Sequence, residues 1–252
     1  MIRAQIILIA LFALTFGFTF GQDKEPTEPE DTELYEPVPP QVVPGKHGAA
    51  PSDAIVLFDG TNLNEWISVA DSTEANWHLN EDGSMTVKDQ TGDIRTKRNF
   101  GSVQLHIEWK SPKEVKGKGQ SRANSGVFLQ GRYEVQVLDN NGNDTYVNGQ
   151  VGSIYKQSIP LAMASVPSGE WNTYDIIFHA PEFSRGGNIV KPATMTVLHN
   201  GVLIQDNFEL EGPTEYRGWP KYKTHGKAPI ILQDHRDNSR VSYRNIWVRE
   251  LD

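Results

Sequence analysis

The feature that most constrains the fold is a strict two-residue alternation of apolar and polar side chains at residues 103–110, VQLHIEWK. Val103, Leu105, Ile107 and Trp109 take every second position. Successive side chains of a β-strand point to opposite faces of the sheet, so this spacing predicts a strand with one buried face. No long helical periodicity competes with such runs elsewhere in the chain.

Further apolar or alternating runs predict strands at residues 55–58, 85–88, 126–130, 133–138, 171–179, 230–233 and 241–251. Residues 194–204 predict a hairpin, because Asn200-Gly201 readily adopts the positive φ angles of a two-residue turn. A chain built of such strands must close or stack its sheets to bury their apolar faces. We therefore expect an all-β, two-sheet antiparallel sandwich of the jelly-roll type.

The composition removes several classes of protein. The 252 residues include no cysteine, which excludes disulfides, thiolate zinc sites, a thiol nucleophile and a lipid-modified N-terminal cysteine. The formal net charge is -8 and the isoelectric point is about 5.4. An acidic chain lacks the positive field that a phosphate backbone demands, so we expect no nucleic-acid partner. The composition does not exclude a neutral or sugar-like ligand.

The first 52 residues read as segments outside the folded domain. Arg3, an apolar run over residues 4–20 and the small residue Gly21 have the pattern of a secretory signal peptide, which we assign to residues 1–21. The alternative is an uncleaved membrane anchor, since the run approaches the ~18 residues that span a bilayer. Residues 22–52 contain seven of the 15 prolines and seven acidic residues, which predicts a disordered linker. The folded domain is expected at residues 53–252.

The most informative stretch for function is NSGVFLQGRYEVQVLD, residues 124–139. On its second strand Glu134 and Gln136 share one face, about 6.8 Å apart along the strand, opposite the face of Tyr133 and the two valines. One interpretation is a solvated outer face. The other is a concave sugar-binding face, on which the carboxyl group acts as acid or base and the amide binds a hydroxyl. The pattern alone leaves both interpretations open.

This stretch, together with GQVGSIYKQSIPLAMASVPSGEWNTYDIIFHAP, TVLHNGVLIQDN, PIILQDHRDNSRVSYRNIWVREL and the opening LFDGTNLNEW, resembles the 3-keto-disaccharide hydrolase domain family. The likeness runs from about Ile55 to the C-terminus. It implies a concanavalin A-like jelly roll, a sugar substrate and export to the periplasm. It also favours the functional interpretation of Glu134 and Gln136.

The same architecture is shared with family 16 glycoside hydrolases, which carry a strand with a nucleophile, a helper carboxylate and an acid. Here the corresponding run is EVQVLD, in which Gln136 replaces the helper and Asp139 is the last carboxylate. A retaining mechanism needs two carboxyl groups about 5 to 5.5 Å apart. Asp139 lies an odd number of residues from Glu134, so without a bulge it points to the opposite face.

The reaction implied by the resemblance does not require a pair of carboxyl groups. A glycoside oxidised at C3 has an acidic proton at C2, and its removal gives an enolate that expels the aglycone from C1. One base and a stabiliser of the enolate oxygen suffice. The resulting site has Glu134 or His235 as the base, Lys156 and Gln136 as enolate and sugar ligands, and, for holding the ring, Arg122, Asn124, Asp139 and Trp219.

No cofactor is predicted, and no compact His and carboxylate cluster has metal-ligand spacing. Residues 139–144 are rich in oxygen ligands but lack the closing Glu of a calcium-binding hand. A divalent metal held by distant strands stays open. Once the signal is removed we expect no membrane partner. Two other functions stay open: a conventional glycan hydrolase using Glu134 and Asp139, and a lectin-like module that binds glycans without cleaving them.

Overall fold

The computed structural model describes residues 25–251 and divides into two units, Met1–Gln41 and Val42–Asp252. The assigned signal peptide, residues 1–21, lies outside the described residues. In the first unit, residues 25–41 contain one short 3-10 helix, η1 (Pro29–Thr32). Within residues 25–251 no helix has the length and apolar character to cross a membrane.

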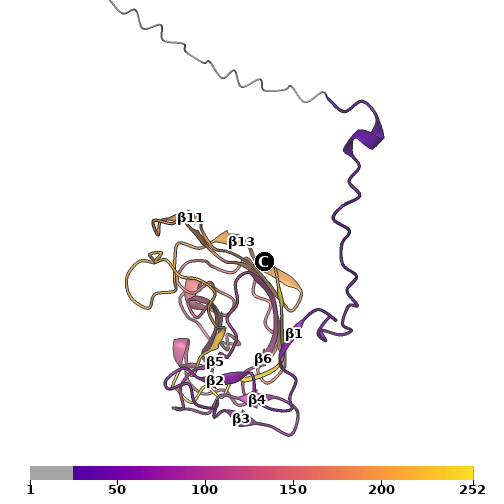
Figure 1. The fold of residues 1–252 in the computed structure, drawn as a ribbon. Helices are drawn as coiled ribbons and strands as arrows, with labels where there is room; N and C mark the ends of the chain where they lie inside the picture. Colours follow the sequence, from indigo (N-terminus) through magenta and orange to yellow (C-terminus); the bar gives the residue numbers. More distant parts are fainter. Residues whose placement is uncertain (1–24, 252) are drawn as a thin grey trace, which may run out of the picture. The chain divides into compact units, whose positions relative to one another are not determined.

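The second unit consists of two antiparallel sheets in two layers, as expected for a jelly-roll sandwich (Figure 1). The larger sheet has the order β13 (Val202–Glu209), β12 (Thr194–His199), β9 (Asn172–His179), β6 (Val103–Lys110), β15 (Ser242–Glu250), β4 (Met85–Thr86) and β3 (His78–Leu79), with β1 (Ile55–Phe58) also beside β15. The smaller sheet has the order β2 (Trp66–Ser68), β5 (Ile94–Thr96), β14 (Ile231–Leu232), β7 (Ser125–Leu129) and β8 (Tyr133–Val137). A separate ribbon pairs β10 (Glu182–Phe183) with β11 (Ile189–Lys191).

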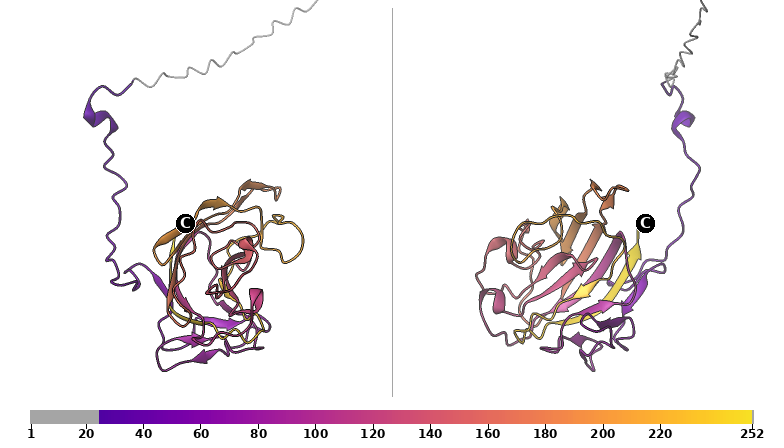
Figure 2. Two further views of the ribbon diagram at one scale, coloured as in Figure 1. Left: turned by 180° about the vertical axis from the view of Figure 1, so that it is seen from behind. Right: turned by 60° about the vertical axis from the view of Figure 1, so that its left-hand side comes forward.

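The core fills the space between the two sheets. On β6 the four apolar residues of the alternating pattern are at most 2% exposed, and on β8 Tyr133, Val135 and Val137 are fully buried. The predicted two-residue turn is also present, since Asn200 and Gly201 both have positive φ between β12 and β13. Figure 2 shows the long strands of the larger sheet lying side by side. The expected fold class is confirmed.

Several short strands were not expected from the sequence. Strands β2, β3, β5, β10 and β11 have only two or three residues each. A period of two cannot be recognised in so few positions, so their partners in the sheets define them. Two of them, β2 and β5, form one side of the smaller sheet, beside β14.

The folded unit begins at Val42, earlier than the expected boundary at residue 53. The reason is a set of backbone contacts that composition does not reveal. The Gly48 carbonyl accepts hydrogen bonds from Asn245 Nδ2 and Trp247 Nε1, both at 2.9 Å. Gly48 has a φ of +79°, and a Cβ built there would lie 3.1 Å from His106. Residues 42–52 therefore cover part of β15 rather than extending the linker.

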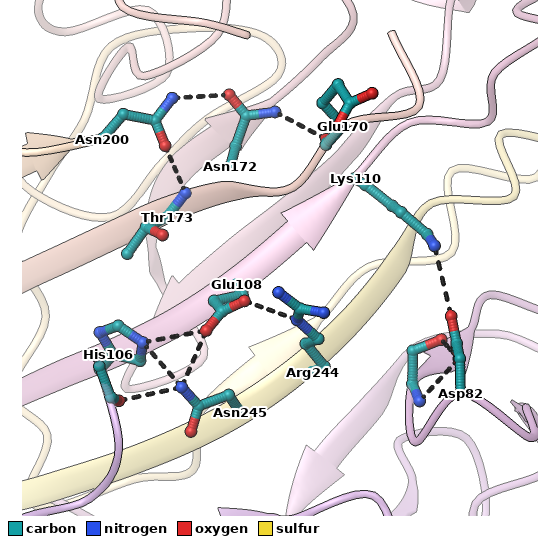
Figure 3. Close-up of polar contacts among 12 residues, drawn as sticks. Asp82, His106, Glu108, Lys110, Glu170, Asn172, Thr173, Asn200, Arg244 and Asn245 are labelled. Atoms are coloured by element: carbon teal, nitrogen blue, oxygen red, sulfur yellow. Dashed lines mark hydrogen bonds and ion pairs between the residues drawn. The ribbon is translucent and has the colours of Figure 1, made fainter. Parts of the chain in front are cut away.

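Beneath this segment the outer face of the larger sheet carries a polar cluster (Figure 3). His106 Nδ1 lies 2.7 Å from Asp175 Oδ1 on β9, and Glu108 accepts hydrogen bonds from Arg244 Nε at 2.6 Å and Asn245 Nδ2 at 2.9 Å. The register of β15 shifts between Arg244 and Trp247, so Asn245 reaches His106 and Glu108. His106 is only 4% exposed, so this part of the predicted polar face is covered and paired.

The charges of this cluster support one another. Burial lowers the pKa of His106, but Asp175 and Glu108 outweigh it and raise that pKa to about 9. Burial raises the pKa of Glu108, but His106, Asn245 and Arg244 together lower it to about 2. At neutral pH the cluster therefore contains a protonated imidazole between carboxylates. It joins β6, β9 and β15, the centre of the larger sheet.

His106 should make the stability of the domain depend on pH. Because its pKa is higher in the folded state than the usual 6.5, its contribution is complete below pH 6.5 and is lost as pH rises through about 9. Urea unfolding at pH 6, 8 and 10 should show this loss in the wild type and a weaker one in His106→Gln. The exposed His78→Gln is the control. An unchanged pH dependence in His106→Gln would contradict the assignment.

Candidate active site

A cavity of about 870 Å³ lies over the outer face of the smaller sheet. Glu134 and Gln136 line it, and they point away from the core face of β8 that carries Tyr133, Val135 and Val137. The walls come from β7, β8, the segment after β14 and three loops, and consist of Gln120, Ser121, Asn124, Phe128, Glu134, Gln136, Tyr146, Tyr155, Lys156, Thr214, Tyr216, Arg217, Gln233 and His235. The cavity thus contains five of the eight predicted site residues.

The hairpin of β7 and β8 makes room for the carboxyl group. Gln130 and Gly131 both have positive φ and turn the chain, after which Phe128 pairs with Glu134 and Gly126 pairs with Gln136. A Cβ built on Gly126 would lie 2.6 Å from Glu134 Oε1. Any larger residue at Gly126 would displace the carboxyl group. This role of Gly126 cannot be recognised in the sequence, because it depends on the pairing of two strands.

Glu134 is buried without a partner for its charge. It is 5% exposed, and no residue among 25–251 forms a hydrogen bond with its carboxyl group. Burial, followed by repulsion from Asp93, raises the pKa of Glu134 to about 8. At neutral pH the group is therefore mostly protonated, and it can donate a proton into the cavity.

Two amides present open acceptors to the same space. Gln136 Nε2 donates to Gln120 Oε1 at 3.0 Å and to the Gly149 carbonyl at 3.2 Å, which fixes the orientation of the amide. Its Oε1 is buried and has no hydrogen-bond partner in the described chain, and the same is true of Gln233 Oε1. A buried acceptor without a partner costs free energy, so these atoms are suited to bind the hydroxyl groups of a ligand.

His235 enters the cavity from the segment after β14. Its Nδ1 lies 3.0 Å from Asp237 Oδ2. Because a carboxylate accepts hydrogen bonds, Nδ1 donates to Asp237, and Nε2 has no hydrogen-bond partner among residues 25–251. Asp234 fixes the segment, since its two carboxylate oxygens accept the backbone N–H groups of Gly92 and Arg236. Asp237 was missed from the sequence, where nothing distinguishes it from other loop aspartates.

Lys156 lies at the rim of the cavity among three tyrosines. Its Nζ donates to the Tyr216 carbonyl at 2.6 Å and lies 4.7 Å from the centroid of the Tyr216 ring. The rings of Tyr155 and Tyr146 are 5.4 and 6.0 Å away, and their hydroxyl groups are 2.6 Å apart. This arrangement holds the ammonium group by cation–π attraction.

Three predicted residues have other positions. Asp139 is fully buried at its side chain, accepts a hydrogen bond from Ser111 Oγ at 2.7 Å, and pairs with Arg122 Nε at 3.2 Å. Neither residue lines the cavity, so the structure does not bring them together with the other predicted site residues. Trp219 is 83% exposed and lines a neighbouring cavity. Asn124 does line the main cavity, while its Nδ2 donates to the Gln120 carbonyl at 2.7 Å.

The position of Asp139 also removes the carboxylate pair of a conventional glycan hydrolase. Strand β8 pairs with β7 without a register shift as far as Val137, and Asp139 beyond it is bound to Ser111 and Arg122 outside the cavity. The oxygen-rich segment after β8 is held by internal bonds, with Asn143 Nδ2 donating to the carbonyls of Asp139 and Gly119. Among the described residues no group of three or more His, Asp or Glu side chains is placed to hold a metal ion.

Glu134 should lower the stability of the folded domain at high pH. Its pKa is about 8 in the folded state against the usual 4.5, so ionisation costs stability progressively as pH rises from 4.5 to 8. The variant Glu134→Gln cannot ionise, and its stability relative to the wild type should therefore increase over this range. Urea unfolding at pH 5, 7 and 9 tests this, with the exposed Glu81→Gln as control. A stability difference that is constant with pH would refute it.

The comparisons with known proteins agree with this architecture. A candidate glycosyl hydrolase from Parabacteroides distasonis ATCC 8503 is 54% identical, with a TM-score of 0.85 over 89% of this chain and 97% of its own. Two further candidate glycosyl hydrolases from that strain, 20% and 22% identical with TM-scores of 0.58 and 0.52, share the fold over 79% of this chain and 94% and 99% of theirs. No match is found among curated proteins. Residues 53–249 match the model of the 3-keto-alpha-glucoside-1,2-lyase-like domain, and the chain therefore belongs to that family.

Proposed function

We propose that this protein cleaves the glycosidic bond of 3-keto-glycosides by elimination, followed by addition of water. The observation that carries the proposal is the pairing, in one cavity, of a buried carboxyl group without a hydrogen bond and an imidazole whose Nε2 is open. One group can donate a proton while the other accepts one. The family match and the 54% identical candidate glycosyl hydrolase support a glycoside as the substrate.

The reaction requires two proton transfers. A base removes the C2 proton, which is acidic because C3 is a carbonyl carbon, and the electron pair forms an enolate. The enolate then re-forms the C3 carbonyl, makes a double bond between C1 and C2, and expels the aglycone oxygen from C1. That oxygen takes a proton from the acid. Water adds to C1 and a proton returns to C2, which gives the free 3-keto sugar and completes a net hydrolysis.

We assign His235 as the base and Glu134 as the acid. The Asp237 carboxylate orients the imidazole and stabilises its protonated form, so it is a positioning residue. Glu134 is protonated at neutral pH and can therefore supply the proton that the leaving oxygen needs. The Lys156 ammonium group is placed at the rim to offset the charge of the enolate, and the amide oxygens of Gln136 and Gln233 bind sugar hydroxyls.

The decisive experiment compares a chromogenic glucoside with its 3-keto derivative, each with and without a chelator. We expect release of the chromophore from the 3-keto compound alone. Cleavage of the plain glucoside would overturn the elimination mechanism. Binding of 3-keto sugars without cleavage would favour the lectin-like module. Loss of activity with the chelator would reveal a metal held by groups beyond those described here.

Variants of the dyad separate its two members. His235→Asn should lower kcat by about 10²–10⁴-fold, the usual contribution of a general base. Asp237→Asn should lower kcat less and leave KM nearly unchanged, because the imidazole keeps its place but loses the carboxylate that orients it. The control is Asp144→Asn, an exposed aspartate outside the cavity. Full activity of His235→Asn would exclude His235 as the base, and an unchanged kcat in Asp237→Asn would exclude its positioning role.

We also propose that the protein is exported to the periplasm, which the sequence of residues 1–21 supports. Export would bring the domain to glycosides outside the cytoplasm. In the acidic, proline-rich residues 25–41 nothing but η1 has regular structure, which suits a spacer between an N-terminal leader and the domain.

A further inference from the structure

A second cavity of about 350 Å³ adjoins the first. Tyr155 and Lys156 line both cavities, so the two spaces meet at these side chains. The other walls of the second cavity are Asn148, Gln157, Glu211, Glu215, Gly218, Trp219 and Pro220. None of these seven residues lines the first cavity.

A single loop, residues 211–221, divides the two cavities. Tyr216 and Arg217 line the first, whereas Gly218 and Trp219 line the second. One short segment therefore presents successive side chains to both spaces. Lys156 Nζ donates to the Tyr216 carbonyl at 2.6 Å, which ties the loop to the point where the cavities meet.

The base of this loop is fixed by its own contacts. The Gln157 side chain donates to the Gly212 carbonyl at 3.0 Å and accepts the Glu211 N–H at 2.9 Å. Gly212 has a φ of +148°, and a Cβ built there would lie 2.7 Å from the backbone nitrogen of Lys221, so the two ends of the loop meet closely. Thr214 is held as well. Its N–H donates to the Arg132 carbonyl, and its hydroxyl oxygen accepts a hydrogen bond from the Glu134 N–H.

Trp219 has no role in the core that would explain its identity. It is 83% exposed, the highest fraction of any tryptophan or tyrosine in the described chain. An exposed indole that lines a cavity is available to stack on the ring of a ligand. The carboxylates of Glu211 and Glu215 line the same space and can accept hydrogen bonds from hydroxyl groups.

We infer that the second cavity binds the leaving group of the substrate, as a ring that stacks on Trp219 while its hydroxyls meet Glu211 and Glu215. This inference rests on the proposed function, which places the keto sugar beside Glu134 and His235. The bond that breaks then lies near Lys156 and Tyr155, where the cavities meet. The ring is either a second sugar or an aryl alcohol, since both present a flat face to an indole.

The test uses three 3-keto-glucosides that differ only in the leaving group: methanol, 4-nitrophenol or glucose. In Trp219→Ala, the ratio of kcat/KM for a ring-bearing substrate to that for the methyl compound should fall about three- to tenfold, and Trp219→Phe should restore most of it. Loss with the aryl compound alone identifies an aryl site, and loss with the disaccharide alone identifies a sugar site. A ratio unchanged for both ring-bearing substrates would overturn the inference.

Two controls complete the design. Leu161→Ala changes an apolar side chain that is 68% exposed and lines neither cavity, and it should leave the ratio unaltered. If the wild type cleaves none of the three compounds, the proposed function fails but the cavity can still be tested. Titration with methyl glucoside and 4-nitrophenyl glucoside should then show tighter binding of the aryl compound, and Trp219→Ala should abolish the difference. Equal binding of the two by the wild type would refute the ring site.

Discussion

The site depends on one electrostatic constraint: a carboxyl group buried without a partner resists ionisation. Strand β8 imposes this condition on Glu134. Its opposite face is in the core, and its neighbour Gly126 leaves the carboxyl group space but offers it no hydrogen bond. Asp93 adds a second charge of the same sign. The surroundings of Glu134 therefore keep its carboxyl group protonated, and the proposed mechanism uses a separate group as the proton acceptor.

That acceptor comes from a different part of the chain, with a different environment. His235 is 35% exposed at its side chain and is paired with Asp237, whereas Glu134 is enclosed. The two groups thus have different environments in one cavity, a carboxyl group without a hydrogen bond and an imidazole beside a carboxylate, and the proposed division into acid and base rests on this difference. The buried charged groups of the larger sheet, in contrast, have partners of opposite charge. There the buried charges of His106 and Glu108 are paired with each other, and they join strands instead of facing a ligand.

The features that could be predicted from the sequence are those that lie within a single strand. Alternation at residues 103–110 and 133–138 was sufficient for the sandwich and for Glu134 and Gln136 on one face, and the odd spacing of Asp139 placed it off that face. Features that need two distant segments were not predictable. Gln233 and Asp237 reach the site only because β14 pairs with β7, and Gly126 matters only because it lies opposite Gln136. Residues 42–52 join the folded unit through contacts such as those of the Gly48 carbonyl. The pair of Arg122 with the buried Asp139 likewise joins two segments, and spacing does not reveal it.

The order of strands in the smaller sheet has a consequence for when the site first exists. Glu134 and Gln136 lie on a local hairpin, but β14, which precedes His235, inserts between β5 and β7 and comes from near the end of the chain. A chain that has not yet placed β14 lacks the segment that carries His235 and also the neighbour of β7, so the cavity around Glu134 is incomplete. The candidate site therefore forms only when the smaller sheet is complete, and partly synthesised chains do not contain it.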